Sequence, residues 1–574
     1  MLRKRISPIV KKVPKWGLFA VCLCLCLWLG VAQAQSRPAA EAVASAHPLA
    51  TAAGIAVLQS GGNAFDAAVT VSAVLAVVEP YGSGIGGGGF WLLHRQSDGK
   101  QVMIDGRERA PLAATRDMYL DRQGEPVPGL SIDGPLSAGI PGAPAALAHI
   151  AENYGRLPLR VTLAPAIHLA REGFEVDPYY RRMAGFRVEA LRGSPAAAEQ
   201  FLLKGDVPPL GHRIVQADLA DTLQALAGQG AAGFYQGEVA RKLVEGTREA
   251  GGIWTLQDLA EYQVVEREPV VGRFQGHRIV SAAPPSSGGV ILIEMLNMLE
   301  QLGLERYGSA DRVHLMTEVM RRAYEDRALY LGDPDFVHVP LQQLTDASYA
   351  RHRIADIDLN KASASEPMPG VGRPEGQDTT HFSILDGEGN RVAATLSINY
   401  PFGSCFVPPG SGVLLNDEMD DFSIKPGTPN AYGLVGNEAN AIAPGKRMLS
   451  SMSPTFIESD DKVAILGTPG GSRIISMLLI GTLQAVEGAP VEQWVGRARF
   501  HHQYLPDHIQ YEPGALSQAT LQTLERKGHQ LRELDDVYGN MQAVLWERDS
   551  GEVSAASDPR GIGASFVNYP PGSE

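Results

Sequence analysis

A pair of threonines, Thr379 and Thr380, stands at the head of a predicted β-hairpin and most constrains how this chain can fold. An apolar segment follows the pair, residues 386–390 (Asp-Gly-Glu-Gly-Asn) have the composition of a turn, and a second apolar segment returns over 392–398. Residues 363–375 are rich in Pro, Gly and Ser, which is typical of an exposed linker. Because threonine is common in strands, this can be an ordinary edge strand that follows a loop.

The same arrangement also suits a precursor that cleaves itself. The Thr379 hydroxyl would attack the carbonyl of Asp378, and hydrolysis of the resulting ester would leave Thr379 as a new N-terminus. Its free α-amine would then act as the base for its own hydroxyl. The heptapeptide 377–383 alone favours the ordinary strand, so the choice depends on the rest of the chain.

The composition limits the class of protein. With 574 residues, the chain can bury one large core or several ordinary ones. Its apolar content of 44% and charged content of 20% are normal for a globular protein. The formal net charge of −14, with no Lys/Arg run in the body of the chain, argues against a nucleic-acid partner.

Residues 1–34 predict a secretory signal peptide. Six basic residues accompany an apolar run over 17–32, and Ala32-Gln33-Ala34 is a small-x-small cleavage site. Cleavage after Ala34 would take the formal charge from −14 to −20 and make the protein periplasmic or secreted. The alternative is an uncleaved membrane anchor, for which the apolar run is short.

Cysteine and histidine placement gives no support for a disulfide or a metal site. Only Cys405 remains once the leader is removed, so no intrachain disulfide can form. There is no CxxC or HExxH pattern. The pair His501-His502 is interpreted as one core and one surface residue of a strand. We expect neither a metal nor a cofactor.

Two segments before the hairpin carry candidate site residues. The glycine-rich stretch 82–89 is followed by a predicted strand and lacks the Gly-Lys-Ser/Thr of a nucleotide-binding loop, so we expect close backbone packing there. Arg107 follows a predicted strand over 101–105. It can belong to a salt-bridged turn or hold a substrate carboxylate with both guanidinium nitrogens.

The first part of the chain is mostly helical by its apolar periodicity. Helices are expected at 48–59, 64–78, 144–154, 163–172, 216–226, 238–250, 290–302 and 310–329, with short strands at 264–271 and 278–281.

Polar residues gather at tight turns after the hairpin. The acids of 416–422 can form a solvated face, a calcium loop or a pocket for an ammonium group. Residues 426–437 are typical of a mobile loop, such as a lid. Ser450 and Ser451 offer adjacent hydroxyls. Residues 467–473 lead into an apolar helix, where a Gly-Gly turn can be a plain connection or an oxyanion hole.

These segments, in this order, resemble the gamma-glutamyltranspeptidases of the N-terminal nucleophile hydrolase superfamily. The resemblance covers essentially the whole mature chain and rests on residues 84–90, 105–108, 379–383, 416–422, 449–455, 467–473 and 499–503. It implies an α+β fold, a four-layer αββα sandwich. It also implies autocleavage between Asp378 and Thr379 into a large subunit, 35–378, and a small subunit, 379–574, that form a heterodimer.

The resemblance also implies roles for individual residues. Thr379 would be the nucleophile, Ser397 would orient it, and Gly470 and Gly471 would form the oxyanion hole. The implied substrate-binding residues are Arg107, Ser450 and Ser451 for an α-carboxylate, Asn399, Glu418 and Asp421 for an α-amine, and Tyr432 in the lid. Two positions depart from the family: Ser397 stands where Thr is commoner, and Glu418 stands where some bacterial members carry Gln.

The implied activity is cleavage of the γ-glutamyl amide of glutathione through an ester on Thr379. The acyl group then passes to water, an amino acid or a dipeptide. One alternative is a glutaryl-cephalosporin acylase on the same fold, although its substrate lacks the α-amine that Glu418 and Asp421 would bind. Another is a non-catalytic periplasmic amino-acid or peptide binding protein, which would need neither a cleavable Thr junction nor a Gly-Gly turn.

Overall fold

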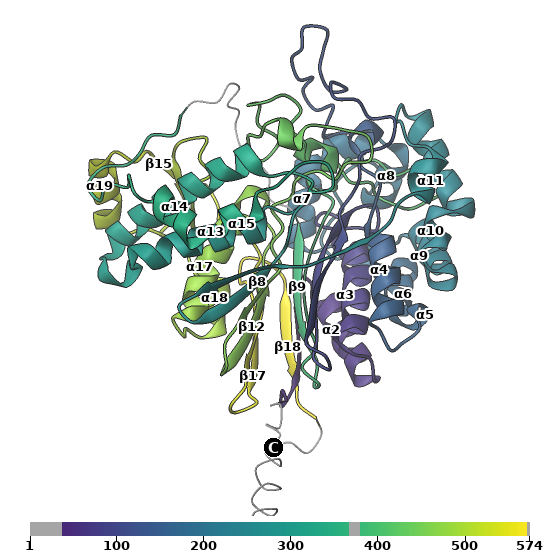
Figure 1. Ribbon diagram of the computed structural model, residues 1–574. Helices are drawn as coiled ribbons and strands as arrows, with labels where there is room; N and C mark the ends of the chain where they lie inside the picture. Colours follow the sequence, from purple (N-terminus) through teal and green to yellow (C-terminus); the bar gives the residue numbers. More distant parts are fainter. Residues whose placement is uncertain (1–36, 367–378, 571–574) are drawn as a thin grey trace, which may run out of the picture. The chain divides into compact units, whose positions relative to one another are not determined.

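Two antiparallel β-sheets form the centre of the computed structural model, which describes residues 37–366 and 379–570 (Figure 1). The chain divides into two units, Met1–Arg37 and Pro38–Glu574. The expected signal peptide, Asp378 and most of the expected linker lie outside the described residues. Within the described ranges, no helix has both the length and the apolar character needed to cross a membrane.

The larger sheet contains the expected hairpin. Its strands are, in spatial order, β18 (Ala564–Asn568), β1 (Glu41–Ser45), β9 (Thr380–Leu385), β10 (Arg391–Ser397), β2 (Gly88–Arg95), β3 (Lys100–Gly106) and β6 (Val265–Arg267). In the hairpin, Leu385 lies opposite Arg391 and Thr380 lies opposite Leu396. Since β9 is flanked by β1 and β10, it is a central strand and not an edge strand.

The smaller sheet has six strands and corrects one expectation. In spatial order they are β17 (Val553–Ser557), β16 (Gln542–Glu547), β12 (Lys462–Gly467), β11 (Thr455–Glu458), β8 (His277–Ser281) and β7 (Val270–Phe274). The single strand expected at 264–271 is wrong, because β6 and β7 belong to different sheets. Pro269 lies between them and has no N–H to continue a ladder.

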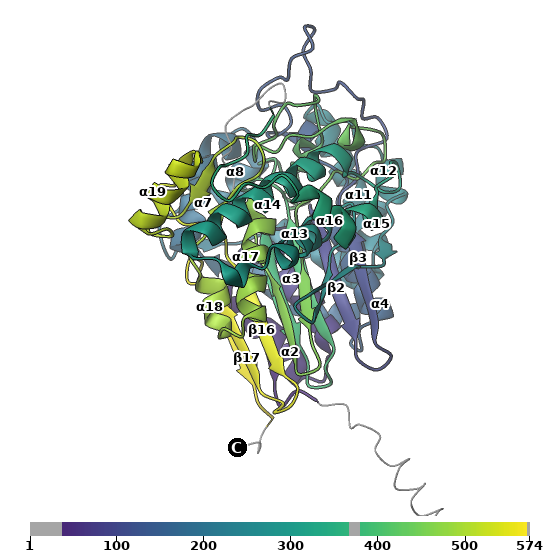
Figure 2. The same ribbon diagram turned by 60° about the vertical axis from the view of Figure 1, so that its left-hand side comes forward.

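Helices pack against both sheets (Figures 1 and 2). The larger sheet contacts α2 (Pro48–Gln59), α3 (Ala64–Val78) and α4 (Ala143–Asn153), and the smaller contacts α13 (Gly288–Leu302), α17 (Ile474–Val486) and α18 (Val491–Gly496). The two sheets contact each other through β1, β9, β10 and β18 of the larger sheet and β12, β16 and β17 of the smaller one. Helices combined with mainly antiparallel sheets place the chain in the expected α+β class.

The remaining elements surround this centre. The further helices are α5 (Leu159–Thr162), α6 (Ala164–Glu172), α7 (Pro178–Arg192), α8 (Pro195–Phe201), α9 (Ala217–Gln229), α10 (Ala232–Tyr235), α11 (Gly237–Glu249), α12 (Leu256–Ala260), α14 (Ser309–Tyr330), α15 (Leu341–Leu344), α16 (Ala347–Arg353) and α19 (Gln518–Lys527). Short 3-10 helices are η1 (Pro135–Ser137), η2 (Leu304–Arg306), η3 (Glu418–Asp421), η4 (Glu438–Asn440) and η5 (Gly471–Arg473). Two small sheets pair β13 (Phe500–His501) with β14 (Ile509–Tyr511) and β15 (Leu531–Glu533), and β4 (Phe174–Glu175) with β5 (Arg213–Ile214).

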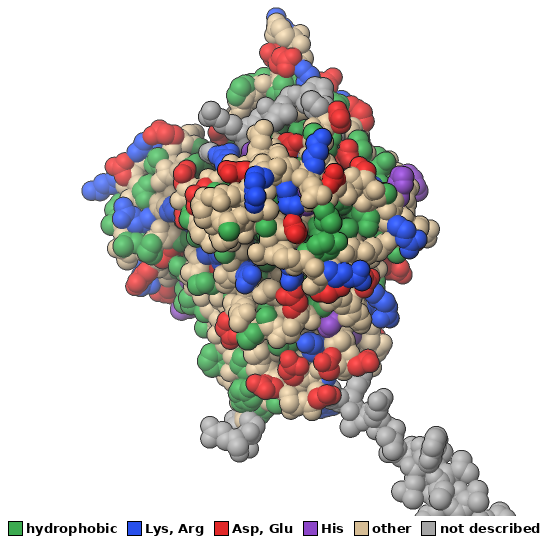
Figure 3. Space-filling model, turned by 90° about the vertical axis from the view of Figure 1, so that its left-hand side faces the viewer, with side chains coloured by type: hydrophobic (Ala, Val, Ile, Leu, Met, Phe, Trp, Pro, Cys, Tyr) green, Lys and Arg blue, Asp and Glu red, His purple; other side chains and the backbone are tan. Residues whose placement is uncertain are grey.

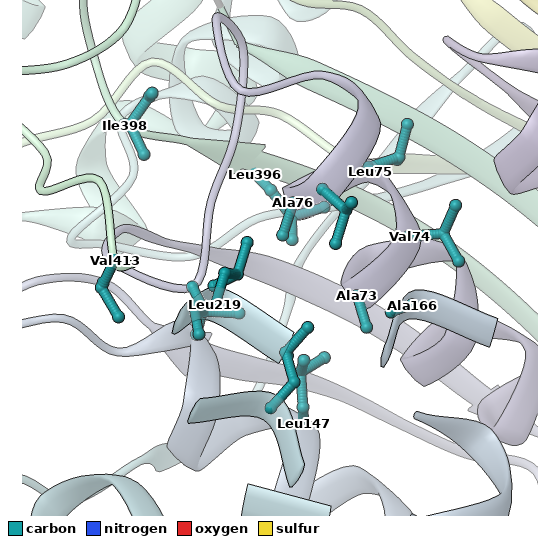
Figure 4. Packing of buried hydrophobic residues seen from close by; sticks show 14 of the residues in the cluster. Ala73, Val74, Leu75, Ala76, Leu147, Ala166, Leu219, Leu396, Ile398 and Val413 are labelled. Atoms are coloured by element: carbon teal, nitrogen blue, oxygen red, sulfur yellow. The ribbon is translucent and has the colours of Figure 1, made fainter. Parts of the chain in front are cut away.

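The larger sheet is buried on both faces. In β2, Trp91 and Leu93 belong to the apolar core that contains α2 and α3, whereas Phe90 and Leu92 belong to the core that contains the smaller sheet. Successive side chains of a strand point to opposite faces, so both faces of β2 pack against apolar residues. Figure 4 shows the first core, where residues 73–76 of α3 pack near residues of α4, α6 and α9.

The surface carries both signs of charge. Figure 3 shows Lys and Arg side chains interspersed with Asp and Glu side chains over the face that it draws. Surface charges also pair across short distances, as Arg312 and Glu487 do at 2.6 Å. A face with mixed signs lacks the basic stripe that follows a phosphate backbone.

Asp386 ties the turn of the central hairpin to the start of α3. Its buried carboxylate accepts hydrogen bonds from the backbone N–H groups of Ala64 at 3.0 Å, Glu388 at 2.9 Å and Asn390 at 2.9 Å. The side-chain amide of Asn390 donates a fourth bond at 2.8 Å. One carboxylate therefore closes the turn and fixes the neighbouring helix.

We expect Asp386→Ala to lower the midpoint of thermal unfolding by several degrees. The change leaves buried N–H donors unpaired, and each unpaired donor costs about 1–3 kcal/mol. Asp549→Ala, at an exposed position in the β16–β17 turn, is the matched control and should leave the midpoint nearly unchanged. Equal midpoints for the two variants would contradict this account of the hairpin.

Candidate active site

One pocket gathers the residues that the sequence singled out. Its lining residues are Arg107, Thr379, Ser397, Asn399, Glu418, Asp421, Tyr432, Leu434, Ser450, Ser451, Met452, Gly471 and Ile474. Of the predicted site residues that are described, only Gly470 does not line it, and Gly470 adjoins Gly471. The pocket lies where β3 and β10 end and where β9 and η5 begin, so it unites segments far apart in the sequence.

The hydroxyl groups of Thr379 and Ser397 meet at the head of the hairpin. Their oxygens are 3.4 Å apart, and both side chains are buried. The backbone N–H of Asn399 donates to the Ser397 hydroxyl oxygen at 2.8 Å. That bond occupies a lone pair of Ser397 and leaves its proton free to be directed elsewhere.

The glycine-rich loop packs its backbone directly against this hairpin. A Cβ on Gly87 would lie 2.2 Å from the Ser397 carbonyl oxygen, and a Cβ on Gly89 would lie 2.6 Å from that of Thr395. No side chain fits at such distances, because only glycine allows so close a backbone approach. The expectation of close backbone packing at 82–89 is confirmed.

Arg107 and two carboxylates form a buried cluster on one wall of the pocket. The guanidinium donates to Glu418 Oε2 and to Asp421 Oδ2, each at 2.6 Å, and to the Met448 carbonyl oxygen at 3.2 Å. Burial opposes the positive charge, but Glu418 and Asp421 raise the pKa of Arg107 above its ordinary value. Burial and the nearby Asp421 charge raise the pKa of Glu418 to about 7, against the lowering effect of Arg107.

This cluster is suited to a ligand that carries both a carboxylate and an ammonium group. Such a zwitterion can place its carboxylate on Arg107 and its ammonium on the two acids, exchanging buried ion pairs for others of the same kind. A ligand with only one of the two charges would leave a buried group unpaired.

The two serines are held differently. The N–H of Met452 donates to the Ser450 hydroxyl oxygen at 3.1 Å. Arg327 donates to the Ser451 hydroxyl oxygen at 3.2 Å and to that of Ser287 at 3.0 Å. Each serine oxygen thus accepts a bond, and its own proton can be donated to a ligand.

Arg327 is a site residue that the sequence reasoning missed. Its guanidinium is buried behind Ser451, and burial lowers its pKa below the ordinary value. It lies in α14, within the expected helix 310–329, where neighbouring arginines give no local sign of which one reaches Ser451. Only the packing of α14 against the segment 450–451 identifies it.

The Gly470-Gly471 turn leads from β12 through η5 into α17, as expected. Gly470 and Gly471 have φ of +138° and +54°, a region that favours glycine. A Cβ on Gly471 would lie 2.3 Å from the Tyr432 ring. Backbone N–H groups at such a helix start attract negative charge.

Tyr432 closes over the pocket from the segment 426–437. Its hydroxyl donates to the Asn399 carbonyl oxygen at 2.5 Å, and its side chain is buried. Asn430, in the same segment, donates to Asp421 at 3.0 Å. The segment expected to be a lid is therefore anchored to the pocket wall at two points.

The expectation of one core and one surface histidine is wrong, because both members of the His501-His502 pair are buried. His501 contacts the Ser476 hydroxyl at 2.8 Å and His502 contacts Asp507 at 3.1 Å. β13 is only two residues long, and the chain turns away after it, so strand alternation does not place His502 at the surface.

Comparisons with known proteins agree with this geometry. The sequence profile of a family described as gamma-glutamyltranspeptidase matches residues 50–567. The glutathione hydrolase proenzyme of Escherichia coli (strain K12) is 44% identical over 92% of this chain and 91% of its own. The chain belongs to the gamma-glutamyltranspeptidase family.

Two solved structures are similar to this member of the gamma-glutamyltranspeptidase family. The cephalosporin acylase from Bacillus halodurans matches with a TM-score of 0.80 and 28% identity, over 92% of this chain and 96% of that chain. The Helicobacter pylori gamma-glutamyltranspeptidase matches with a TM-score of 0.54 and 41% identity, over 56% of this chain and 92% of that chain. The fold is therefore shared by a protein named as a cephalosporin acylase and by one named as a gamma-glutamyltranspeptidase.

We expect Gly87→Ala to displace Ser397 and to lower the thermal unfolding midpoint, because the new Cβ would overlap the Ser397 carbonyl oxygen. Gly185→Ala is the control. Gly185 lies exposed in α7 with open space around it, so alanine there should raise stability by up to about 1 kcal/mol. A Gly87→Ala protein as stable as the wild type, with an unmoved Ser397 in its crystal structure, would contradict the packing argument.

Proposed function

We propose that this chain is a precursor that cleaves itself between Asp378 and Thr379. The large subunit, 35–378, and the small subunit, 379–574, would remain together as a heterodimer. The placement of the Thr379 hydroxyl beside Ser397 inside the pocket supports this proposal. The word proenzyme in the name of the E. coli relative supports it too, as does the H. pylori chain, whose match has nearly the extent of the expected large subunit.

We further propose the four-layer αββα sandwich of the N-terminal nucleophile hydrolases for the pair of subunits. Two sheets that contact each other, each with helices packed against it, support this assignment. Export through the signal peptide, residues 1–34, would place the protein in the periplasm or the medium.

The reaction that the pocket supports best is hydrolysis or transfer of a γ-glutamyl group, with glutathione as a donor and amino acids or dipeptides as acceptors. The observation that carries it is the joint placement of Arg107, Glu418 and Asp421 in one pocket with the Thr379 hydroxyl. Arg107 with Ser450 and Ser451 would hold the donor's α-carboxylate. Its α-ammonium would bind Asn399, Glu418 and Asp421, as the sequence predicts.

The chemistry follows from the remaining residues. The α-amine of Thr379 would take the hydroxyl proton as Thr379 attacks the γ-amide carbon, and Ser397 would orient the nucleophile. Backbone N–H groups of Gly470 and Gly471 would stabilise the oxyanion, and one such donor is worth about 3 kcal/mol of barrier. The Thr379 α-ammonium would return the proton to the leaving amine, and water or an acceptor amine would then resolve the ester. These steps use side chains and backbone of the protein alone, without a cofactor.

The similarity to a cephalosporin acylase favours one second candidate, a glutaryl-cephalosporin acylase. A glutaryl group lacks the α-amine and would leave the buried charges of Glu418 and Asp421 without a cationic ligand. The acid pair therefore favours the γ-glutamyl donor.

Self-cleavage is tested by the mass of the denatured protein. Wild-type protein should give two fragments, the smaller one starting at Thr379, and Thr379→Ala should give a single uncut chain. Addition of glutathione to the cleaved form should release glutamate. An uncut wild-type chain that binds glutamyl compounds without turnover would support the binding-protein alternative instead.

The pH dependence tests the binding of the α-ammonium. Because the pKa of Glu418 is about 7, the carboxylate forms as the pH rises through 7, and kcat/KM for γ-glutamyl-p-nitroanilide should rise with it. Glu418→Gln should remove this rise. Any pH dependence of kcat/KM that comes from titration of the Thr379 α-amine should persist in Glu418→Gln.

Glutaryl-p-nitroanilide is the control substrate, since it lacks the ammonium. Its kcat/KM should show no rise through pH 7 in the wild type, because ionised Glu418 finds no ammonium group on this substrate. A preference of the wild type for the glutaryl compound would support the acylase instead.

A further inference from the structure

Glu79 is a buried carboxyl group that the proposed reaction does not use. It follows the last residue of α3 and is 4% exposed. A Cβ added to Gly82 would lie 3.3 Å from the Glu79 Cδ and 3.5 Å from the Thr379 carbonyl oxygen. The Glu79 side chain and the backbone of Thr379 therefore pack against the same glycine.

The polar atoms around Glu79 lack partners. Glu79 Oε2, Thr380 Oγ1 and Asp177 Oδ2 are buried and form no hydrogen bond with another described group. The other Asp177 oxygen accepts bonds from the N–H groups of Tyr179 and Tyr180 at the start of α7. Buried polar atoms without partners are rare in proteins and call for an explanation.

The charge of Glu79 depends on three neighbouring effects. Burial, the largest effect, and the Asp177 carboxylate at the start of α7 together raise its pKa to about 8, although the adjoining Thr380 hydroxyl acts to lower it. At neutral pH the group is therefore a protonated acid, which can accept a bond from Thr380 and donate one to Asp177. That arrangement would give partners to all three oxygens.

We propose that Glu79 is a positioning residue for self-cleavage, and that its carboxyl group links Thr380 at the start of β9 to Asp177 at the start of α7. The link would hold the backbone of Thr379 against Gly82 while its hydroxyl attacks the preceding carbonyl. This inference rests on the proposed cleavage before Thr379. It assigns a role in self-cleavage to Glu79, which takes no part in the attack of Thr379 itself.

The link should fail in alkaline solution. As the pH rises through about 8, ionised Glu79 loses its donor and repels Asp177, so the rate of cleavage should fall. Glutamine at this position keeps one donor and one acceptor at every pH. It should therefore retain the link and remove the alkaline loss.

Pulse-chase of the full chain made by cell-free synthesis tests the inference. Labelled chain is transferred to buffers from about pH 6 to 10, and the uncut fraction is followed on denaturing gels. Glu79→Gln should cleave at the wild-type rate at pH 7 without the alkaline fall. Glu79→Ala should cleave about tenfold or more slowly at every pH, because the unpaired oxygens remain buried.

Glu294→Gln is the matched control. Glu294 is a buried acid of α13 whose pKa is raised by burial and by the nearby Asp326, and both of its carboxyl oxygens lack partners. Glu294 lies in α13, which packs in the core of the smaller sheet and not in the core of α3. Glu294→Gln should therefore keep the wild-type cleavage rate and pH profile. A similar shift in both profiles would mean that any buried acid has this effect and would overturn the assignment to Glu79.

The remaining outcomes separate this inference from the one it rests on. Wild-type rate and pH dependence in Glu79→Ala would overturn the role of Glu79 alone. If Glu79→Ala fails to fold, the profile of Glu79→Gln decides, and a retained alkaline fall overturns the role. A wild-type chain that stays uncut at every pH, like Thr379→Ala, would overturn both proposals together.

Discussion

Burial of the β9–β10 hairpin on both faces is the constraint on which the site depends. Every residue of β9 and β10 is buried, and Thr379 and Ser397 stand at the end of the hairpin that opens into the pocket. The glycine-rich loop then packs so closely that no side chain separates it from the Ser397 backbone. The two hydroxyls are thereby held inside the protein but open to the pocket. Their separation of 3.4 Å is longer than an ordinary O–H···O bond.

The charged side chains of the pocket make ligand binding selective, because a ligand that lacks a complementary charge leaves one of them unpaired. Arg107 already has partners in Glu418 and Asp421, so a ligand gains little from a single new charge contact. Removing one partner of a buried pair costs about 3–5 kcal/mol, because the other charge is left in a medium that solvates it poorly. A ligand that gives Arg107 a carboxylate and gives Glu418 and Asp421 an ammonium group avoids this penalty.

Much of the fold and site could be predicted from local sequence. Periodicity placed α2 and α3, and turn composition placed the hairpin, because these features depend on neighbouring residues. Features set by distant contacts were missed or wrong. The strand at 264–271 divides between two sheets, Arg327 is one of several helical arginines, and the amide donors that hold Asp386 include one from a distant segment, Ala64. The effect of the Thr380 hydroxyl on Glu79 likewise comes from a residue some three hundred positions away.

The strand order has a consequence for a chain cut before Thr379. β1 would belong to the first fragment, yet it lies between β18 and β9 of the second, and β10 of the second pairs with β2 of the first. In the other sheet, β8 of the first fragment pairs with β11 of the second. The fragments would be interwoven by main-chain hydrogen bonds, so neither could leave without unravelling both sheets. Each molecule would keep its original pair of fragments for as long as it stays folded, and fragments would not exchange between molecules.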